Sequence, residues 1–155
     1  MKTVRVLLIG FYPIVREGLK AILAVDYEIE PVLEAADADQ ALLQLKQASD
    51  EGRPIHVVLT EARTSTLDGI HTTRLIKQAY PEIPVLVLTK CINDSNLIDA
   101  IHAGAAGYFF LDDMSPKVLL LSMDCMIERH TDECYSVARC CRESEPKMAE
   151  RSLHS

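Results

Sequence analysis

Five short apolar runs alternate with longer amphipathic segments, and this alternation limits the folds open to the chain more than any other feature. The runs cover residues 4–9, 29–35, 57–61, 85–89 and 108–111. Runs rich in β-branched and aliphatic residues are typical of parallel strands that are buried on both faces. Parallel strands need crossover connections, which place helices on the faces of the sheet. The sequence therefore predicts an α/β fold with a doubly wound, five-stranded parallel sheet.

The segments between the runs carry apolar residues at helical spacing. Pro13 opens the first helix, whose predicted core positions are Ile14, Val15, Leu19, Ile22 and Leu23. Asp37 or Asp39 caps the second helix, and Asp68 caps the third, which runs from about residue 69 to 80. The predicted core positions of the fourth, before Gly104, are Leu97, Ile98 and Ile101. Ser115 and Pro116 open the last helix, and Pro31 favours an edge position for the second strand.

Composition restricts the function classes. The 155 residues carry a formal charge of -7, which disfavours direct binding to nucleic acid or to an anionic membrane, since both need a basic surface. The first apolar run is too short for a signal peptide, and no apolar stretch could span a bilayer, so we expect a cytoplasmic protein. We predict one domain over residues 1–128 and a polar tail over 129–155 that is partly helical or disordered.

The five cysteines are Cys91, Cys125, Cys134, Cys140 and Cys141. Their number is odd and no export signal precedes them, so we interpret them as reduced thiols of a cytosolic protein. A metal site formed by His130, Cys134 and the Cys140–Cys141 pair is the alternative. It lacks the paired C-x2-C spacing that arranges ligands around zinc.

Several segments together resemble the receiver domain of two-component response regulators, and their wording is closest to the NarL/FixJ subfamily. The residues that carry the resemblance are 4–9, 13–19, 34–36, 57–59, 67–69, 85–89 and 103–108. They include Leu67-Asp68-Gly69 and keep the order and spacing of every element between about residues 3 and 127. The resemblance implies the flavodoxin-like (CheY-like) receiver fold.

The resemblance also implies where a functional site would lie. In that family an aspartate at the end of the third strand accepts a phosphoryl group from a histidine kinase, and two acidic residues after the first strand hold a magnesium ion. A Ser or Thr ends the fourth strand and a lysine ends the fifth. In this sequence Glu61 stands at the acceptor position, Gly10 and Phe11 at the acidic pair, Thr89 at the hydroxyl and Leu111 at the lysine.

These departures predict a degenerate pseudo-receiver. Magnesium requires hard oxygen ligands, which Gly10 and Phe11 lack. Phosphoryl transfer relies on electrostatic stabilisation of the transferring oxygens, and here the metal ligands, the aspartate and the lysine are all replaced. We therefore expect no catalytic residue, no magnesium cofactor and no enzymatic activity, since no phosphate-cradling glycine loop, nucleophile elbow or catalytic triad is present either.

Two interpretations of Glu61 remain. It is either a permanent negative charge that draws in the Thr89 hydroxyl or pairs with Lys90, or a partly solvated remnant of a lost site. Phe11 either fills the emptied magnesium pocket, which burial of its ring favours, or is exposed for a partner. Asp112 and Asp113 either cap the last helix or form a metal site with Glu61.

The last helix is apolar over more than one face, so a second face should be covered. A second copy of the chain, another protein or the chain's own tail could cover it, and we predict a homodimer that involves this helix. The residues assigned to that contact are Leu119, Leu120, Met123, Met126 and Ile127. The predicted function is an interaction module that signals without phosphorylation, with a protein partner such as a histidine kinase or a transcription factor. The alternatives are the receiver part of a transcription regulator whose DNA-binding domain is absent from this chain, and a receiver that is still weakly phosphorylated.

Overall fold

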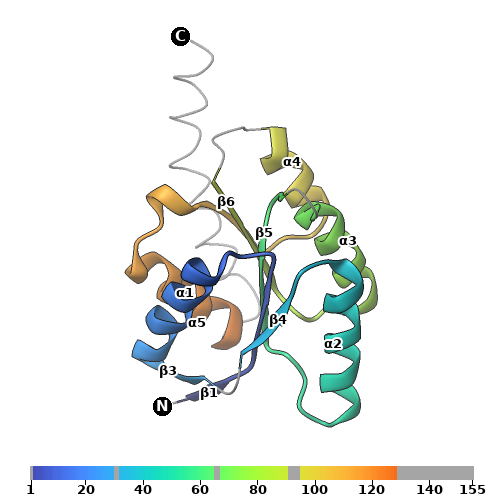
Figure 1. Ribbon diagram of the computed structural model, residues 1–155, viewed down its shortest axis with the longest axis horizontal. Helices are drawn as coiled ribbons and strands as arrows, with labels where there is room; N and C mark the ends of the chain where they lie inside the picture. The colour runs from blue at the N-terminus through green and yellow to red at the C-terminus, as the bar shows by residue number, and fades with distance from the viewer. Residues whose placement is uncertain (1, 30–31, 65–66, 91–94, 129–155) are drawn as a thin grey trace.

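A five-stranded parallel sheet separates two layers of helices (Figure 1). The computed structural model describes residues 2–29, 32–64, 67–90 and 95–128. The sheet has the strand order β4–β2–β5–β6–β7, and all of its neighbouring strands are parallel. Its strands are β2 (Val6–Ile9), β4 (Leu33–Ala35), β5 (Val57–Glu61), β6 (Val85–Thr89) and β7 (Gly107–Phe110). The prediction of a doubly wound, five-stranded parallel sheet is confirmed.

The helices cover both faces of this sheet. Helices α1 (Pro13–Asp26) and α5 (Pro116–Glu128) lie on one face. Helices α2 (Ala38–Asp50), α3 (Gly69–Ala79) and α4 (Ser95–His102) lie on the other, and a short 3-10 helix, η1 (Leu111–Asp113), follows β7. The side chain of Asp37 caps α2 and that of Asp68 caps α3, while the Ser115 hydroxyl accepts a hydrogen bond from the Val118 N–H in the first turn of α5.

The first and second predicted strands are each divided in the structure. Val4 ends β1 (Lys2–Val4), which pairs with β3 (Tyr27–Ile29) in a separate two-stranded ladder, and β2 begins after Arg5. The imidazole of His56 explains the break at Arg5. Its Nδ1 accepts the Arg5 N–H at 2.9 Å, while the His56 N–H donates to the Arg5 carbonyl at the same distance. A side chain thus takes the place of a neighbouring strand at this residue.

Side chains alternate between the two faces of the sheet, and each face has its own core. Leu8, Leu59 and Leu88 face α1 and α5, whereas Leu7, Ile9 and Val58 face α2 and α3. A third cluster joins Val87 to Tyr108 and Phe110 beneath α4. Strands β2, β5, β6 and β7 are buried along their whole length, which explains why they lack the polar alternation of a half-exposed strand, whereas the edge strand β4 is only partly buried.

Two of the predicted helix faces are wrong in part. Ile14 is 83% exposed, since α1 packs on the sheet through Leu19 and Leu23 and Ile14 lies on its outer side. In α4, Ile98 and Ile101 are 59% and 39% exposed. The small residues Ala100 and Ala103 face the sheet there, because the aromatic rings of β7 already fill the space beneath the helix.

Residues 129–155 lie outside the described part of the chain, and so do the predictions for the tail and for His130, Cys134, Cys140 and Cys141. Within the described ranges, no helix has both the length and the apolar character needed to cross a membrane.

Candidate functional site

The candidate site lies where β2, β5, β6 and β7 end, at one edge of the sheet. Ligands of open parallel sheets bind at this edge, next to the point where the strand order reverses. Glu61 is the last residue of β5 and Thr89 the last of β6, while Gly10 and Phe11 directly follow β2 and Leu111 directly follows β7. The structure therefore gathers the sequence-predicted positions at one edge of the fold.

Glu61 is a buried carboxylate with one cationic partner. Its side chain is 3% exposed, and Oε1 lies 3.3 Å from the ammonium nitrogen of Lys90. Oε2 is buried and has no hydrogen-bond partner among the described residues. A carboxylate this deeply buried is costly unless it is paired, so the ion pair with Lys90 is the contact that makes the charge tolerable. The partial solvation that one interpretation of Glu61 assumed is therefore wrong.

Lys90 connects Glu61 to the start of α1. Its side chain is 44% exposed, and Nζ lies 3.9 Å from the centre of the Tyr12 ring, within the range of a cation–π contact. Tyr12 is the N-cap residue of α1 and is itself 61% exposed. The three side chains form a continuous path from a buried anion through a cation to a surface ring, which we call the Glu61–Lys90–Tyr12 bridge.

Gly69 fixes the backbone at the end of β5. A Cβ atom at this position would lie 1.8 Å from the Glu61 carbonyl oxygen and 2.9 Å from its carbonyl carbon, so only glycine fits. The Gly69 N–H donates to the Ala62 carbonyl, and Asp68 accepts from the Ile70 and His71 N–H groups. The start of α3 is thereby held directly against the residue that carries the site's charge.

The positions of the expected acidic pair carry no carboxylate, and apolar groups pack against both of them. Gly10 has φ +83°, and a Cβ added there would lie 2.4 Å from a methyl carbon of Leu67, which is itself buried. Phe11 is 4% exposed and belongs to the core cluster beneath α1 and α5, where Leu111 also packs. Phe11 thus fills space inside the fold and is not presented to a partner.

The donor set at this edge does not fit a magnesium ion. Magnesium prefers several hard oxygen ligands in an octahedral arrangement, whereas the residues at the acidic-pair positions are a glycine and a buried phenyl ring. Glu61 supplies the only carboxylate among the five site positions, and it already pairs with Lys90.

Asp112 and Asp113 do not form a metal site with Glu61. Both are exposed in η1, and within the described residues no three His, Cys, Asp or Glu side chains are grouped closely enough to hold a metal ion.

The assignment of partner contacts on the last helix needs correction. Leu119, Met123 and Met126 are at most 4% exposed and form part of the core beneath α1 and α5, so a partner cannot reach them. Leu120 and Ile127 are partly buried against the same core.

Helix α5 is apolar over a wide arc because α1 packs beside it. The hydroxyl of Tyr27, the residue that follows α1, donates a hydrogen bond to Asp124 of α5. Leu121 is the apolar α5 residue that reaches the surface, at 50% exposure.

Sequence reasoning missed two residues of the site and the full role of a third. Tyr12 is absent from the sequence-predicted site, because the cation–π contact with Lys90 has no signature in residue spacing. Leu67 occupies the space beside Gly10, which only the folded loop shows. Gly69 was assigned as the first residue of α3, and its contact with Glu61 was not foreseen.

The comparisons with known proteins agree on one family. The family model described as "Response regulator receiver domain" matches residues 6–122. The transcriptional regulatory protein DegU of Brevibacillus brevis is 28% identical over 117 residues, which are 76% of this chain and 47% of DegU. The DNA-binding transcriptional activator DevR/DosR of Mycobacterium tuberculosis is 31% identical over 109 residues, 70% of this chain and 48% of that protein. The chain thus spans about half the length of these curated relatives.

Solved structures show the same fold. The crystal structure of a LuxR-family two-component response regulator from Aurantimonas sp. SI85-9A1 superposes with a TM-score of 0.70 at 26% identity. The match covers 82% of this chain and 86% of that one. The prediction of a CheY-like receiver fold is therefore confirmed.

Proposed function

Because this chain belongs to the response regulator receiver domain family, we propose that it is a signalling module that works through protein contacts and without phosphorylation. The site would not carry out phosphoryl transfer. A fixed negative charge at Glu61 would stand where the family places its phosphoryl group, and the module would act by docking on a partner such as a histidine kinase or a transcription factor.

The Glu61–Lys90 ion pair is the observation that carries this proposal. The carboxylate is 3% exposed, and its charge is matched by a cation from the residue after β6. A phosphodonor would have to displace this cation and reach a buried oxygen without a metal ion to neutralise the incoming phosphate. Phosphoryl transfer gains most of its acceleration from such neutralisation, so the ion pair favours a permanent charge over a transient one.

Phosphorylation can be tested directly by mass spectrometry. We expect no mass increase when the full chain is incubated with magnesium and acetyl phosphate, because the site lacks the carboxylates that would bind the metal ion. Intact mass would be measured at intervals after addition of the phosphodonor, with Glu61→Gln as the control. An adduct on the native chain that disappears in the control would overturn the proposal. An adduct present in both would lie at another residue and leave Glu61 unphosphorylated.

A second candidate function is the receiver part of a transcription regulator. The names of DegU and DevR/DosR favour it, since both are transcription regulators about twice as long as the matched region. In that case the effector domain would be outside this sequence. A mobility-shift assay with the chain as given should show no DNA retardation at physiological salt, because its formal charge is -7. Retardation by this chain alone would contradict both candidates.

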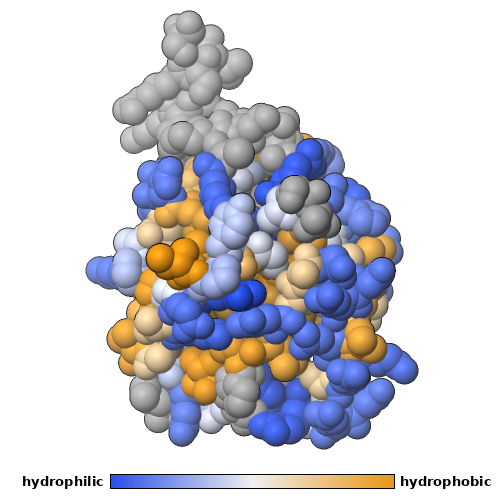
Figure 2. Space-filling model, viewed as in Figure 1, coloured by the Kyte–Doolittle hydropathy of each residue, from blue (hydrophilic) through white to orange (hydrophobic). Residues whose placement is uncertain are grey.

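We further propose that the chain forms a homodimer through the outer surface of α1 and α5. Ile14 and Val25 lie on the outer side of α1, three turns apart, and are 83% and 66% exposed. Leu121 on the adjacent α5 is 50% exposed. Apolar side chains reach the surface on the side of the molecule where these helices lie (Figure 2). We call Ile14, Val25 and Leu121 the α1–α5 surface.

Substitution Leu121→Glu should convert this dimer to a monomer, because it places a charge in an apolar contact. Light scattering after size-exclusion chromatography, at high micromolar concentration, would measure the mass. Ile98→Glu is the matched control, since Ile98 is 59% exposed, slightly more than Leu121, but lies on α4, on the other face of the sheet. The assignment of this surface would be contradicted if the native chain were a monomer. It would also be contradicted if Ile98→Glu abolished the dimer while Leu121→Glu kept it.

A further inference from the structure

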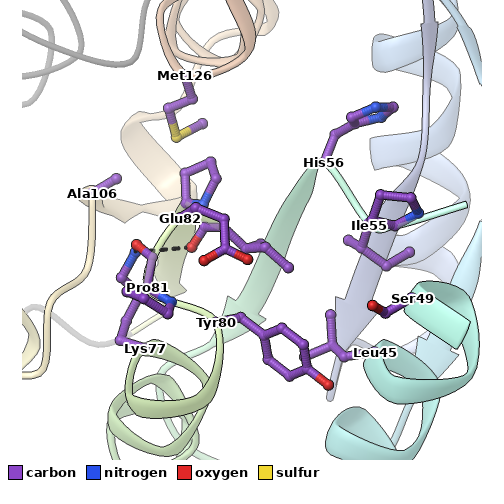
Figure 3. A pocket seen from close by; sticks show the side chains of 13 residues that line it. Leu45, Ser49, Ile55, His56, Lys77, Tyr80, Pro81, Glu82, Ala106 and Met126 are labelled. Atoms are coloured by element: carbon purple, nitrogen blue, oxygen red, sulfur yellow. Dashed lines mark hydrogen bonds between the residues drawn. The ribbon is translucent and has the colours of Figure 1, made fainter. Parts of the chain in front are cut away.

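The most voluminous of the described cavities lies at the opposite edge of the sheet from Glu61 and holds about 590 Å³ (Figure 3). Its walls come from the ends of α2 and α3, from the loops that enter β5, β6 and β7, and from Met126 of α5. The walls are mainly apolar. They are formed chiefly by Leu45, Ile55, Tyr80, Pro81, Ile83 and Met126. A concave apolar site of this size suits a small organic ligand.

Lys77 and Glu82 place opposite charges on one side of this cavity. The Lys77 ammonium group donates to the carbonyl oxygens of Pro81 at 2.6 Å and of Ile83 at 3.0 Å. An ammonium group has three donors, so one remains after these two bonds. Figure 3 shows Lys77, Pro81 and Glu82 together on the side of the cavity that faces Tyr80.

Burial and charge act on Lys77 in opposite directions. Burial lowers the pKa of the Lys77 ammonium, and the negative charge of Glu82 raises it to a smaller extent. A ligand carboxylate beside Lys77 would act in the same direction as Glu82 and would stabilise the charged form. Gly104, in a turn with φ +97°, packs against the Lys77 side chain, since a Cβ there would lie 3.1 Å from Lys77 Cγ. The position of the cation is therefore set by the fold.

We propose that this cavity binds a free α-amino acid with a large apolar side chain. The ligand carboxylate would accept the remaining Lys77 donor, its ammonium group would pair with Glu82, and its side chain would pack between Tyr80 and the aliphatic wall. The charge pattern supports a zwitterion over a simple acid or amine, because one cation and one anion border a surface that is mainly apolar apart from Ser49 and His56. This site is independent of the proposed function, since it shares no residue with the Glu61–Lys90–Tyr12 bridge.

The probe is L-phenylalanine, compared with two derivatives that each lack one charge. N-acetyl-L-phenylalanine has no ammonium group, and L-phenylalaninamide has no carboxylate. Each would be titrated into the ¹⁵N-labelled full chain to about 10 mM, because a ligand of about a dozen heavy atoms is expected to bind in the millimolar range. We expect L-phenylalanine to shift the amide signals of Ser49, Ile55 and Tyr80, and each derivative to bind about tenfold more weakly, as for the loss of one charge-assisted contact.

Two outcomes would overturn the proposal. One is the absence of saturable shifts at these amides with L-phenylalanine. The other is equal binding of all three compounds, which would reduce the cavity to a general apolar site.

Two variants locate the charges on the protein. Glu82→Gln should remove the advantage of L-phenylalanine over the N-acetyl derivative, and Lys77→Met its advantage over the amide. Glu28→Gln and Lys46→Met are the matched controls, since Glu28 on β3 and Lys46 on α2 are exposed and do not line the cavity. If the Lys77→Met variant does not fold, two measurements decide. They are the comparison of the three compounds on the native chain and the same comparison on Glu82→Gln.

Discussion

Substitution Gly69→Ala should lower the free energy of unfolding by about 3 kcal/mol or more, since among the glycines of the chain an added Cβ makes its closest contact with backbone here. The new Cβ would lie 1.8 Å from the Glu61 carbonyl oxygen. This contact cannot be relieved by a rotamer change, because the obstructing atoms belong to the backbone at the end of β5. Either α3 must move away from the sheet or the end of β5 must shift, and overpacking of this kind typically costs 1–3 kcal/mol even where side chains can adapt.

Urea denaturation followed by circular dichroism would measure this loss. For a chain of 155 residues, about 3 kcal/mol corresponds to a fall in melting temperature of roughly 10 °C. Gly18→Ala is the matched control. Gly18 lies inside α1, and outside the backbone of that helix nothing lies within 4 Å of an added Cβ, so alanine should stabilise the domain by about 0.5–1 kcal/mol. Equal effects at the two glycines would show that the close approach at Glu61 does not exist in solution.

The second large effect is expected at Lys90. Substitution Lys90→Met removes the cationic partner of Glu61 and leaves a carboxylate that is 3% exposed without compensation. Breaking a fully buried pair costs 3–5 kcal/mol. Lys90 is 44% exposed and solvent weakens its interactions, so we expect a smaller loss of about 2 kcal/mol.

A double-mutant cycle separates the ion pair from the general effect of each substitution. Lys90→Met should cost far less in a Glu61→Gln background, where no buried charge is left behind, and the coupling between the two substitutions should be at least about 1 kcal/mol. Lys46→Met is the control, because its ion pair with Asp50 is 3.9 Å long and exposed, and its loss should change stability by less than about 0.5 kcal/mol. Additive effects of the Lys90 and Glu61 substitutions would show that the pair does not support the buried charge.

The sequence carried enough information for the sheet and its helices, because burial of whole strands leaves a visible pattern. The run 85–89 was predicted with the bounds that β6 has, and Asp68 was correctly assigned as the cap of α3. The division of residues 4–9 could not be predicted, since it depends on the His56 imidazole, which is 51 residues away in the sequence. The prediction of which helix residues are buried is wrong where contacts with other elements decide the packing, as for Ile98 in α4, which lies over the rings of β7.

The candidate site divides in the same way. The site positions could be predicted because each lies at or just after the end of a strand, and the family resemblance aligns these strand ends. The positions are Gly10, Phe11, Glu61, Thr89 and Leu111. The choice between Thr89 and Lys90 as partner of Glu61 was left open, and side-chain geometry favours Lys90, whose Nζ is 3.3 Å from the carboxylate. The apolar character of α5 was interpreted as a partner surface, but most of it is used inside the chain. Composition alone cannot separate a helix that contacts a partner from one that packs beside α1.

The exposed ring of Tyr12 makes the buried charge accessible to events at the surface. A partner that covered this ring would also remove water from the Lys90 ammonium group, and the lower local dielectric would strengthen its attraction to Glu61. By thermodynamic linkage, anything that strengthens the ion pair must in turn favour that partner by the same free energy. Docking of a partner at the start of α1 and the strength of the ion pair at the end of β5 are then coupled through one equilibrium. No chemical modification is needed for this coupling.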